Sequence, residues 1–222
     1  MYRLLLFDFD GTIADSLRQG LEHYNALAEQ YGFLPVRNVE AARQMSTRSF
    51  FKAHRIPLRR LPKLYREFMS LQRAEMHRVQ LCEGVCEVLS VLSRRFRLGI
   101  LSSNSEENIR TCLRANQAEE HFDFVRSHPR IFGKHTSLRK ILKQEGLRRE
   151  EVVYVGDEVR DAEASSRVGV AFCGVTWGIH SGRQLEAHGA RYLANRPSDL
   201  LKVLAKEGVA DEPQPEPVLG AH

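Results

Sequence analysis

The sequence has no long hydrophobic run. None of its 222 residues belongs to a stretch that approaches the roughly 18 consecutive apolar residues needed to span a bilayer. Near the amino terminus a single four-residue run, Leu4 to Phe7, leads directly into two acids. This start is too short and too acidic for a signal peptide, so we expect a protein with neither a secretion signal nor a membrane partner.

Cysteine is scarce and shows no metal-ligand spacing. The chain has four cysteines, of which Cys82 and Cys86 would share a helix face, but no second cysteine pair or histidine pair completes a zinc site. We interpret all four, including Cys112 and Cys173, as buried or free thiols in a reducing compartment. Together with the missing hydrophobic runs, this predicts a cytoplasmic protein.

The chain also lacks internal repeats and has no strand pattern between about residues 16 and 80. That stretch has helical periodicity, in which Ser16 is a candidate helix cap and Gly32 a candidate helix end. From Val36 to Gln80 it holds eleven Lys or Arg against three acids. Such a surplus attracts anions, although most of these residues are expected on solvated helix faces.

The rest of the chain alternates short apolar runs with helical patterns. Buried strands are predicted at residues 3–8, 98–101, 122–125, 152–155, 168–175 and 191–193. This alternation predicts an α/β fold, a doubly wound parallel sheet interrupted after its first strand by an all-helical insert. The predicted division is residues 1–14 and 81–205 for the core and 15–80 for the insert. The acidic, Pro-rich residues 206–222 are predicted to be disordered.

Polar residues gather where the predicted strands end. Asp8 and Asp10 follow the first strand, Ser103 and Asn104 the second, and Asp157 a third. Ligands of open parallel sheets bind at the carboxyl ends of the strands. Acids from two strands make an oxygen site suited to Mg²⁺, and hydroxyl groups, backbone N–H groups and a lysine, Lys134, suit phosphate. The set predicts phosphoryl transfer to a carboxylate nucleophile.

Four motifs in this order resemble the haloacid dehalogenase superfamily. They are DFDGT at 8–12, LSSN at 101–104, Lys134, and GDEVRD at 156–161. The resemblance is to its phosphoglycolate-phosphatase-like and β-phosphoglucomutase-like branch, which has a Rossmann-like core and a helical cap. It covers about residues 1–205, and the first motif is its most specific part.

The resemblance implies roles for the motif residues. Asp8 is the nucleophile that forms an aspartyl-phosphate, and Asp10 is the general acid and then the base that activates water. Residues i and i+2 lie on one side of an extended chain, which suits two carboxylates that act on one group. Lys134 neutralises charge at Asp8, and phosphate is bound by the residues Gly11, Thr12, Ser103 and Asn104.

The resemblance also implies a magnesium site and a cap contact to the substrate. Mg²⁺ is held by the Asp8 carboxylate, the Asp10 backbone carbonyl and Asp157, with Asp161 bound directly or through water. Glu158 is a weaker candidate. In the insert, Arg48 is the first candidate for contacting the substrate, and Arg43 the second. The basic surplus suits a substrate with more negative charge than its phosphate alone.

Three functions remain open from the sequence. The leading hypothesis is a Mg²⁺-dependent phosphatase for a small phosphorylated metabolite, either phosphoglycolate-like or a sugar phosphate. A phosphosugar mutase of the β-phosphoglucomutase type has the same first motif and a similar cap. The third is a binding protein whose basic insert contacts an acidic partner, and no nucleic-acid partner is expected. The complete set of acids argues against the third, because pure binding needs no such pair of carboxylates.

Overall fold

A computed structural model describes residues 1–128 and 133–205. Before the first return to the sheet, the chain forms β1 (Leu4–Phe7), α1 (Leu17–Tyr31), α2 (Val39–Arg43), α3 (Thr47–Ala53), η1 (Leu58–Arg60), α4 (Leu61–Glu75) and η2 (Met76–Arg78). It continues through α5 (Val85–Leu92), β2 (Arg97–Ser102), α6 (Glu106–Ala115), η3 (Glu119–His121), β3 (Phe124–Ser127) and α7 (Lys134–Glu145). The remaining elements are η4 (Arg149–Glu151), β4 (Val152–Gly156), α8 (Val159–Val168), β5 (Ala171–Val175), α9 (Gly182–Ala187), β6 (Tyr192–Ala194) and α10 (Pro197–Ala205).

The strands form one parallel sheet in the order β3-β2-β1-β4-β5-β6. The chain runs outward from β1 to β3, then returns to β1's other side and continues to β6. The order therefore reverses between β1 and β4, where Phe7 pairs with Val155. A crevice at such a reversal is where doubly wound sheets bind ligands. The predicted α/β fold with a doubly wound parallel sheet is confirmed.

The two faces of the sheet are covered by different helices. Alternate side chains of a strand point to opposite faces, and in β1 Leu5 and Phe7 join the apolar cluster that contains α5, α6 and α10. Leu4 and Leu6 join the cluster on the other face, with α7, α8 and α9. All four side chains of β1 are buried, so the strand that carries Asp8 is held from both faces and its end is rigid.

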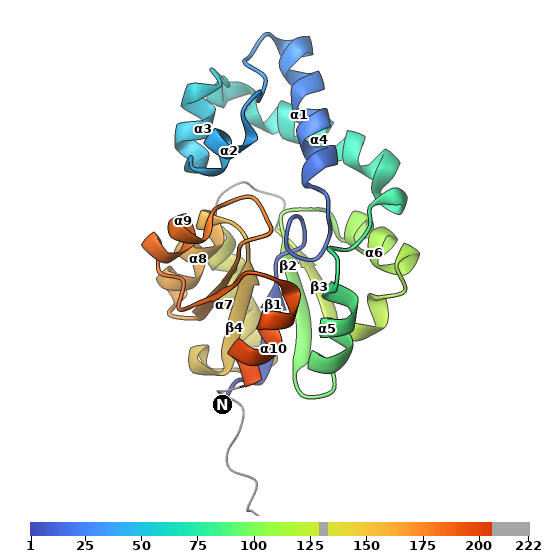
Figure 1. Cartoon of the computed structure of the whole chain (residues 1–222), viewed down its shortest axis with the longest axis vertical. Coiled ribbons are helices and arrows are strands. Elements are labelled where there is room, and N and C mark those ends of the chain that lie inside the picture. The colour runs from blue at the N-terminus through green and yellow to red at the C-terminus, as the bar shows by residue number, and fades with distance from the viewer. Residues whose placement is uncertain (129–132, 206–222) are drawn as a thin grey trace, which may run out of the picture.

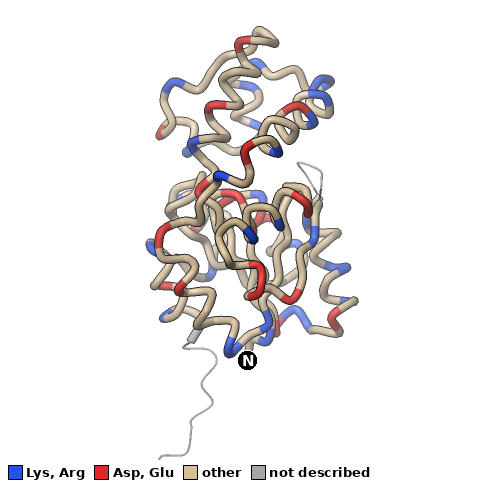
Figure 2. The backbone as a smooth tube through the Cα atoms, turned by 90° about the vertical axis from the view of Figure 1, so that its right-hand side faces the viewer, with Lys and Arg blue, Asp and Glu red and all other residues tan. Residues whose placement is uncertain are grey.

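The helices from Leu17 to Glu75 form a separate lobe, here called the insert (Figure 1). In that view the chain starts at the bottom and the insert lies at the top. Because the strands are parallel, their carboxyl ends point toward the insert. It has its own apolar cluster, which includes Leu27, Phe33 and Leu64. Figure 2 shows its Lys and Arg residues spread over several helices. We propose that this lobe acts as the cap.

Two local predictions were wrong. Ser16 does not cap α1 with its side chain, because its hydroxyl donates to Asp10 instead. The strand predicted from Val168 begins only at Ala171, since Val168 ends α8 and Gly169 takes a left-handed C-cap conformation. The four cysteines are free thiols, and no helix in residues 1–128 and 133–205 is long and apolar enough to cross a membrane. The predicted disordered tail lies outside the described residues.

Candidate active site

Asp8 is fixed at the end of β1. Its backbone N–H still donates to Val155, so the sheet pairing extends to this residue. The side chain is 2% exposed. Its Oδ1 accepts a hydrogen bond from the backbone N–H of Phe9 at 2.8 Å, and its Oδ2 lies 2.8 Å from the ammonium of Lys134. One carboxylate oxygen is thus held by the backbone and the other by a cation.

Lys134 begins α7 and is buried among acids and a tyrosine. Its ammonium lies 2.7 Å from Asp161 Oδ1 and donates to the Tyr154 hydroxyl at 3.0 Å. The Tyr154 hydroxyl in turn donates to the carbonyl of Leu101 at 2.8 Å. Burial acts to lower the pKa of Lys134, but the charges of Asp161 and Asp8 outweigh it and raise that pKa. Lys134 therefore remains protonated beside Asp8.

Asp10 is held by two neutral donors. The Ser16 hydroxyl donates to its Oδ1 at 2.7 Å, and the Asn104 amide donates to its Oδ2 at 2.9 Å. Burial raises the pKa of Asp10 in spite of these hydrogen bonds. Burial also acts to raise the pKa of Asp8, but Lys134 and Arg160 hold it below its ordinary value. The site thus shifts the pKa values of its two carboxyl groups in opposite directions.

Asp157 and Asp161 complete an acidic cluster with Asp8. Oxygen atoms of these three buried carboxylates lie within 4.8 Å of one another. The oxygens of Asp157 accept from the Thr12 hydroxyl at 2.9 Å and the Ile179 backbone N–H at 2.7 Å, both neutral donors. Burial, together with the charges of Glu158 and Asp8, raises the pKa of Asp157 to about 8.

This cluster fits a divalent cation. Asp161 Oδ2 is buried and has no hydrogen-bond partner within residues 1–128 and 133–205. Burial and the nearby charge of Asp8 raise the pKa of Asp161 well above its ordinary value, although Lys134 opposes this. An oxygen without a partner and two carboxylates that resist ionisation on their own are features that a bound cation would satisfy. Hard oxygen donors of this kind suit Mg²⁺.

Gly11 and Thr12 shape the cluster rather than line an open surface. Gly11 has φ +74°, and a Cβ there would lie 2.4 Å from Asp157 Oδ2. The Thr12 side chain is buried against Asp157, and the backbone N–H groups of both residues bond within the turn, to Ala14 and Phe9. The two residues therefore bring the turn after β1 close to Asp157.

Ser103 and Asn104 follow β2 and have different surroundings. Asn104 is buried and bonded to Asp10, as described above. The Ser103 hydroxyl accepts a hydrogen bond from Arg160 at 3.1 Å, which leaves its own proton available to donate. Arg160 also pairs with Glu158, and the Tyr65 hydroxyl of the insert donates to the Ser103 carbonyl. Glu158 therefore faces an arginine in this structure.

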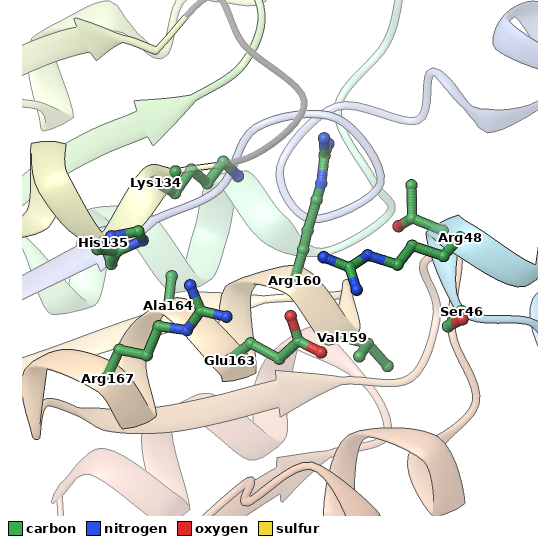
Figure 3. A pocket seen from close by; sticks show the side chains of 11 residues that line it. Ser46, Arg48, Lys134, His135, Val159, Arg160, Glu163, Ala164 and Arg167 are labelled. Carbon is green, nitrogen blue, oxygen red and sulfur yellow. The ribbon is translucent and has the colours of Figure 1, made fainter. Parts of the chain in front are cut away.

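A cavity of about 220 Å³ lies beside Lys134, between the insert and the core (Figure 3). Arg48 reaches it from the insert, and Lys134, Arg160 and Arg167 reach it from the core. The structure thus places the exposed Arg48 at the cavity. It does not place Arg43 there, because that guanidinium donates to the backbone carbonyls of Thr176 and Ile179.

Sequence reasoning missed Ser16, Tyr154, Arg160 and the backbone of Ile179 as parts of the site. Tyr154 had a signal, since its hydroxyl is the one polar tip in the buried strand Val152–Gly156. Arg160 stands within the motif GDEVRD, directly before Asp161, and an arginine among three acids is itself a signal. Ile179 had none, because its contribution is a backbone N–H that any residue supplies.

Comparison with known proteins agrees with the geometry. Residues 5–175 match the family described as haloacid dehalogenase-like hydrolase. A phosphoglycolate phosphatase from Synechococcus elongatus is 34% identical over 205 residues, which cover 91% of this chain and 97% of that protein. The chain therefore belongs to the haloacid dehalogenase-like hydrolases.

More distant matches also extend along almost the whole chain. The pyrophosphatase PpaX of Bacillus mycoides is 25% identical over 219 residues, covering 91% of this chain and 96% of the relative. The crystal structure of a predicted phosphatase from Clostridium acetobutylicum superposes with a TM-score of 0.80 at 20% identity. That match covers 93% of this chain and 99% of the other, so the fold is shared along almost the whole chain, insert included.

Proposed function

We propose that the protein is a Mg²⁺-dependent phosphatase that hydrolyses a small phosphate monoester through an aspartyl-phosphate on Asp8. One observation carries this proposal: Asp8 lies beside the Lys134 ammonium, whereas the neighbouring Asp10 is held by the neutral donors of Ser16 and Asn104. These surroundings and burial shift the pKa values of the two carboxyl groups in opposite directions. An ionised carboxylate can attack phosphorus, and a carboxyl group that keeps its proton can donate it to the leaving oxygen.

The proposed reaction has two steps, and Asp10 transfers a proton in each. In the first, an Asp8 oxygen forms a bond to phosphorus, the ester P–O bond breaks, and the leaving oxygen takes the proton of Asp10. In the second, Asp10 removes a proton from water, the water oxygen bonds to phosphorus, and the Asp8–phosphorus bond breaks. Ser16 and Asn104 orient the Asp10 carboxyl group for both transfers. Lys134 offsets the charge of Asp8 as the phosphate approaches.

Asp8, Asp157 and Asp161 would hold the Mg²⁺, with the Asp10 backbone carbonyl as the further proposed ligand. Bound there, the ion supplies positive charge that offsets repulsion between a carboxylate nucleophile and a phosphate dianion. The Ser103 hydroxyl, directed by Arg160, donates to a phosphoryl oxygen, and Asn104 supports this edge of the site through Asp10. Gly11 and Thr12 keep the turn close to Asp157.

The cavity supports a substrate with a second negative group. The described residues that line it include four cations, Lys134, Arg48, Arg160 and Arg167, and one carboxylate, Glu163. Within the core, Lys134 already pairs with Asp8 and Asp161, and Arg160 pairs with Glu158. Burial acts to lower the pKa of Arg160, but Glu158 and Asp161 raise it, so its charge is permanent. We therefore rank a phosphoglycolate-like substrate, which carries a carboxylate, above a phosphate ester of an uncharged sugar. Pyrophosphate, an anhydride rather than a monoester, is the alternative that the PpaX relative suggests. A cytoplasmic location stays a prediction.

A panel of phosphate compounds with released phosphate as the readout tests the proposal. The panel contains 2-phosphoglycolate, pyrophosphate, β-glucose 1-phosphate and ethyl phosphate, each assayed with Mg²⁺ and with EDTA. We expect Mg²⁺-dependent release that Asp8→Asn abolishes. Asp10→Asn should lower kcat by about 10²–10⁴-fold, the usual contribution of general acid–base catalysis.

Other outcomes separate the alternatives. Turnover that is unchanged in EDTA or in Asp8→Asn contradicts the proposal. Isomerised sugar phosphate without net phosphate release, followed by phosphorus NMR, indicates a mutase instead. Salt-sensitive binding of an acidic partner that survives Asp8→Asn, with no turnover of any compound, indicates a binding protein.

A further inference from the structure

The loop of residues 176–181, which follows β5, contacts Asp157 through several backbone groups. The Ile179 N–H donates to Asp157 Oδ2 at 2.7 Å, and the His180 N–H donates to the Asp157 carbonyl at 3.1 Å. A Cβ added at Gly178 would lie 2.2 Å from the Cβ of Asp157, so the loop backbone touches this side chain. The Trp177 indole also donates to the carbonyl of Thr12 at 3.1 Å. The position of Asp157 therefore depends on this loop.

The same loop holds the insert on its other side. The Arg43 guanidinium donates through Nε to the Ile179 carbonyl at 3.1 Å and through Nη2 to the Thr176 carbonyl at 3.0 Å. His180 Nε2 lies 3.0 Å from the carbonyl of Met45. At the start of α9, the Gln184 amide donates to the Gln44 carbonyl at 2.6 Å. Residues 43–45 of the insert are thus seated on the loop that positions Asp157.

Ile179 joins the two sides directly, because its N–H faces Asp157 and its carbonyl faces Arg43. We propose that Arg43 is a positioning residue: by seating the insert on loop 176–181 it orients Asp157 for the metal ion. This rests on the Mg²⁺ site of the proposed function. Seating of the insert and metal binding then strengthen each other by the same factor, since coupling between two binding events is reciprocal.

The expected size of this coupling follows from the behaviour of residues that hold metal ligands in place. Removing a residue that orients a metal ligand typically weakens metal binding by about 10–100-fold. Arg43 bonds to the carbonyl of Ile179, the residue whose N–H orients Asp157, and to the carbonyl of Thr176. Its two hydrogen bonds therefore fix the loop at two points. Its ion pair with Glu40, 3.7 Å away within α2, further directs the guanidinium. Arg43 acts on the metal ligand through the loop and not on the substrate.

Mg²⁺ binding to the metal-free protein tests this without any turnover. Trp177 is the only tryptophan of the chain and lies in the loop, so its fluorescence reports binding, with isothermal titration calorimetry as the independent measurement. We expect Arg43→Met to weaken Mg²⁺ binding about 10-fold and Arg43→Lys to restore part of the loss. Arg59→Met, which removes the same charge at an exposed position of the insert, should bind Mg²⁺ like the wild type.

The reciprocal effect is measured by hydrogen exchange. Mg²⁺ should slow exchange in residues 43–46 as well as in 176–181 of the wild type, and in Arg43→Met the protection of 43–46 should be lost. Equal Mg²⁺ affinity of wild type and Arg43→Met overturns the coupling and leaves the phosphatase proposal intact. A wild type that binds no Mg²⁺, with Asp157→Asn indistinguishable from it, overturns both.

Discussion

The metal-free protein should lose stability as the pH rises, and Asp157→Asn should remove much of this dependence. The folded-state pKa of Asp157 is about 8, against 3.8 ordinarily. Between these values the folded protein holds a proton that the unfolded chain has released. The free energy of unfolding therefore falls with rising pH, by up to about 1.4 kcal/mol per pH unit from this group. Over two units that is about 3 kcal/mol.

The asparagine variant adds a second, pH-independent change. Its amide oxygen can still accept from Thr12, but its amide nitrogen faces the Ile179 N–H, so one part-buried donor loses its acceptor, at a cost of about 1–3 kcal/mol for a buried group and less here. Asp157→Asn should thus be the less stable protein near pH 5.5. By pH 7.5 the difference should move by about 3 kcal/mol in favour of the variant, so that it closes or changes sign.

Urea unfolding in EDTA, followed by circular dichroism, measures both proteins across this range. If the free energies of unfolding of the two proteins changed with pH in parallel, Asp157 would ionise normally in the folded state and the prediction would be wrong. Saturating Mg²⁺ provides the second arm of the experiment. The ion binds the deprotonated carboxylate, so it should stabilise the wild type more strongly as the pH rises and leave the variant nearly unaffected.

Two further predictions use matched controls. Gly11→Ala and Gly32→Ala both place a side chain at positive φ, but only at Gly11 does the new Cβ meet Asp157, at 2.4 Å, whereas nothing lies within 4 Å at Gly32. Thermal unfolding should show that each variant loses about 1–2 kcal/mol of stability because of its left-handed backbone conformation. Mg²⁺ affinity should fall for Gly11→Ala alone, and equal Mg²⁺ affinities of the two variants would show that the contact with Asp157 does not matter. Tyr154→Phe leaves the Leu101 carbonyl without its donor and should cost about 1–3 kcal/mol in urea unfolding, against a smaller loss for Tyr2→Phe at a half-buried hydroxyl pair. Equal losses in the two tyrosine variants would show that the bonds of the Tyr154 hydroxyl to Leu101 and Lys134 add nothing beyond those of a part-buried hydroxyl pair.

Much of the architecture follows from local sequence features. The apolar run before Asp8 and the polar residues after β2 and β4 mark the ends of buried strands, and parallel pairing brings such ends to one edge. This is why Asp8, Asp157 and Asp161 could be expected together from positions far apart in the chain. The structure places their oxygens within 4.8 Å. Their roles in catalysis remain proposals that the experiments above address.

Two kinds of interaction could not be predicted from the sequence. One is made by backbone groups, and the other depends on which of several possible partners a side chain takes. Ser16 has the residue type and position of a helix cap, yet its hydroxyl bonds to Asp10, because that acceptor lies within 2.7 Å of it. Arg43 and Arg48 are equally basic, but the fold turns one toward backbone carbonyls and the other toward the cavity. Only three-dimensional packing decides between such partners.

In the proposed mechanism, Asp8 carries the phosphoryl group during the reaction. Acid quenching during turnover of the best substrate, followed by peptide mass spectrometry, measures it directly. We expect a phosphoryl group on Asp8 in the wild type with Mg²⁺, a larger labelled fraction if Asp10→Asn slows the second step more than the first, and none in Asp8→Asn. Turnover with phosphate on no residue, or on a residue other than Asp8, would show that Asp8 is not the nucleophile.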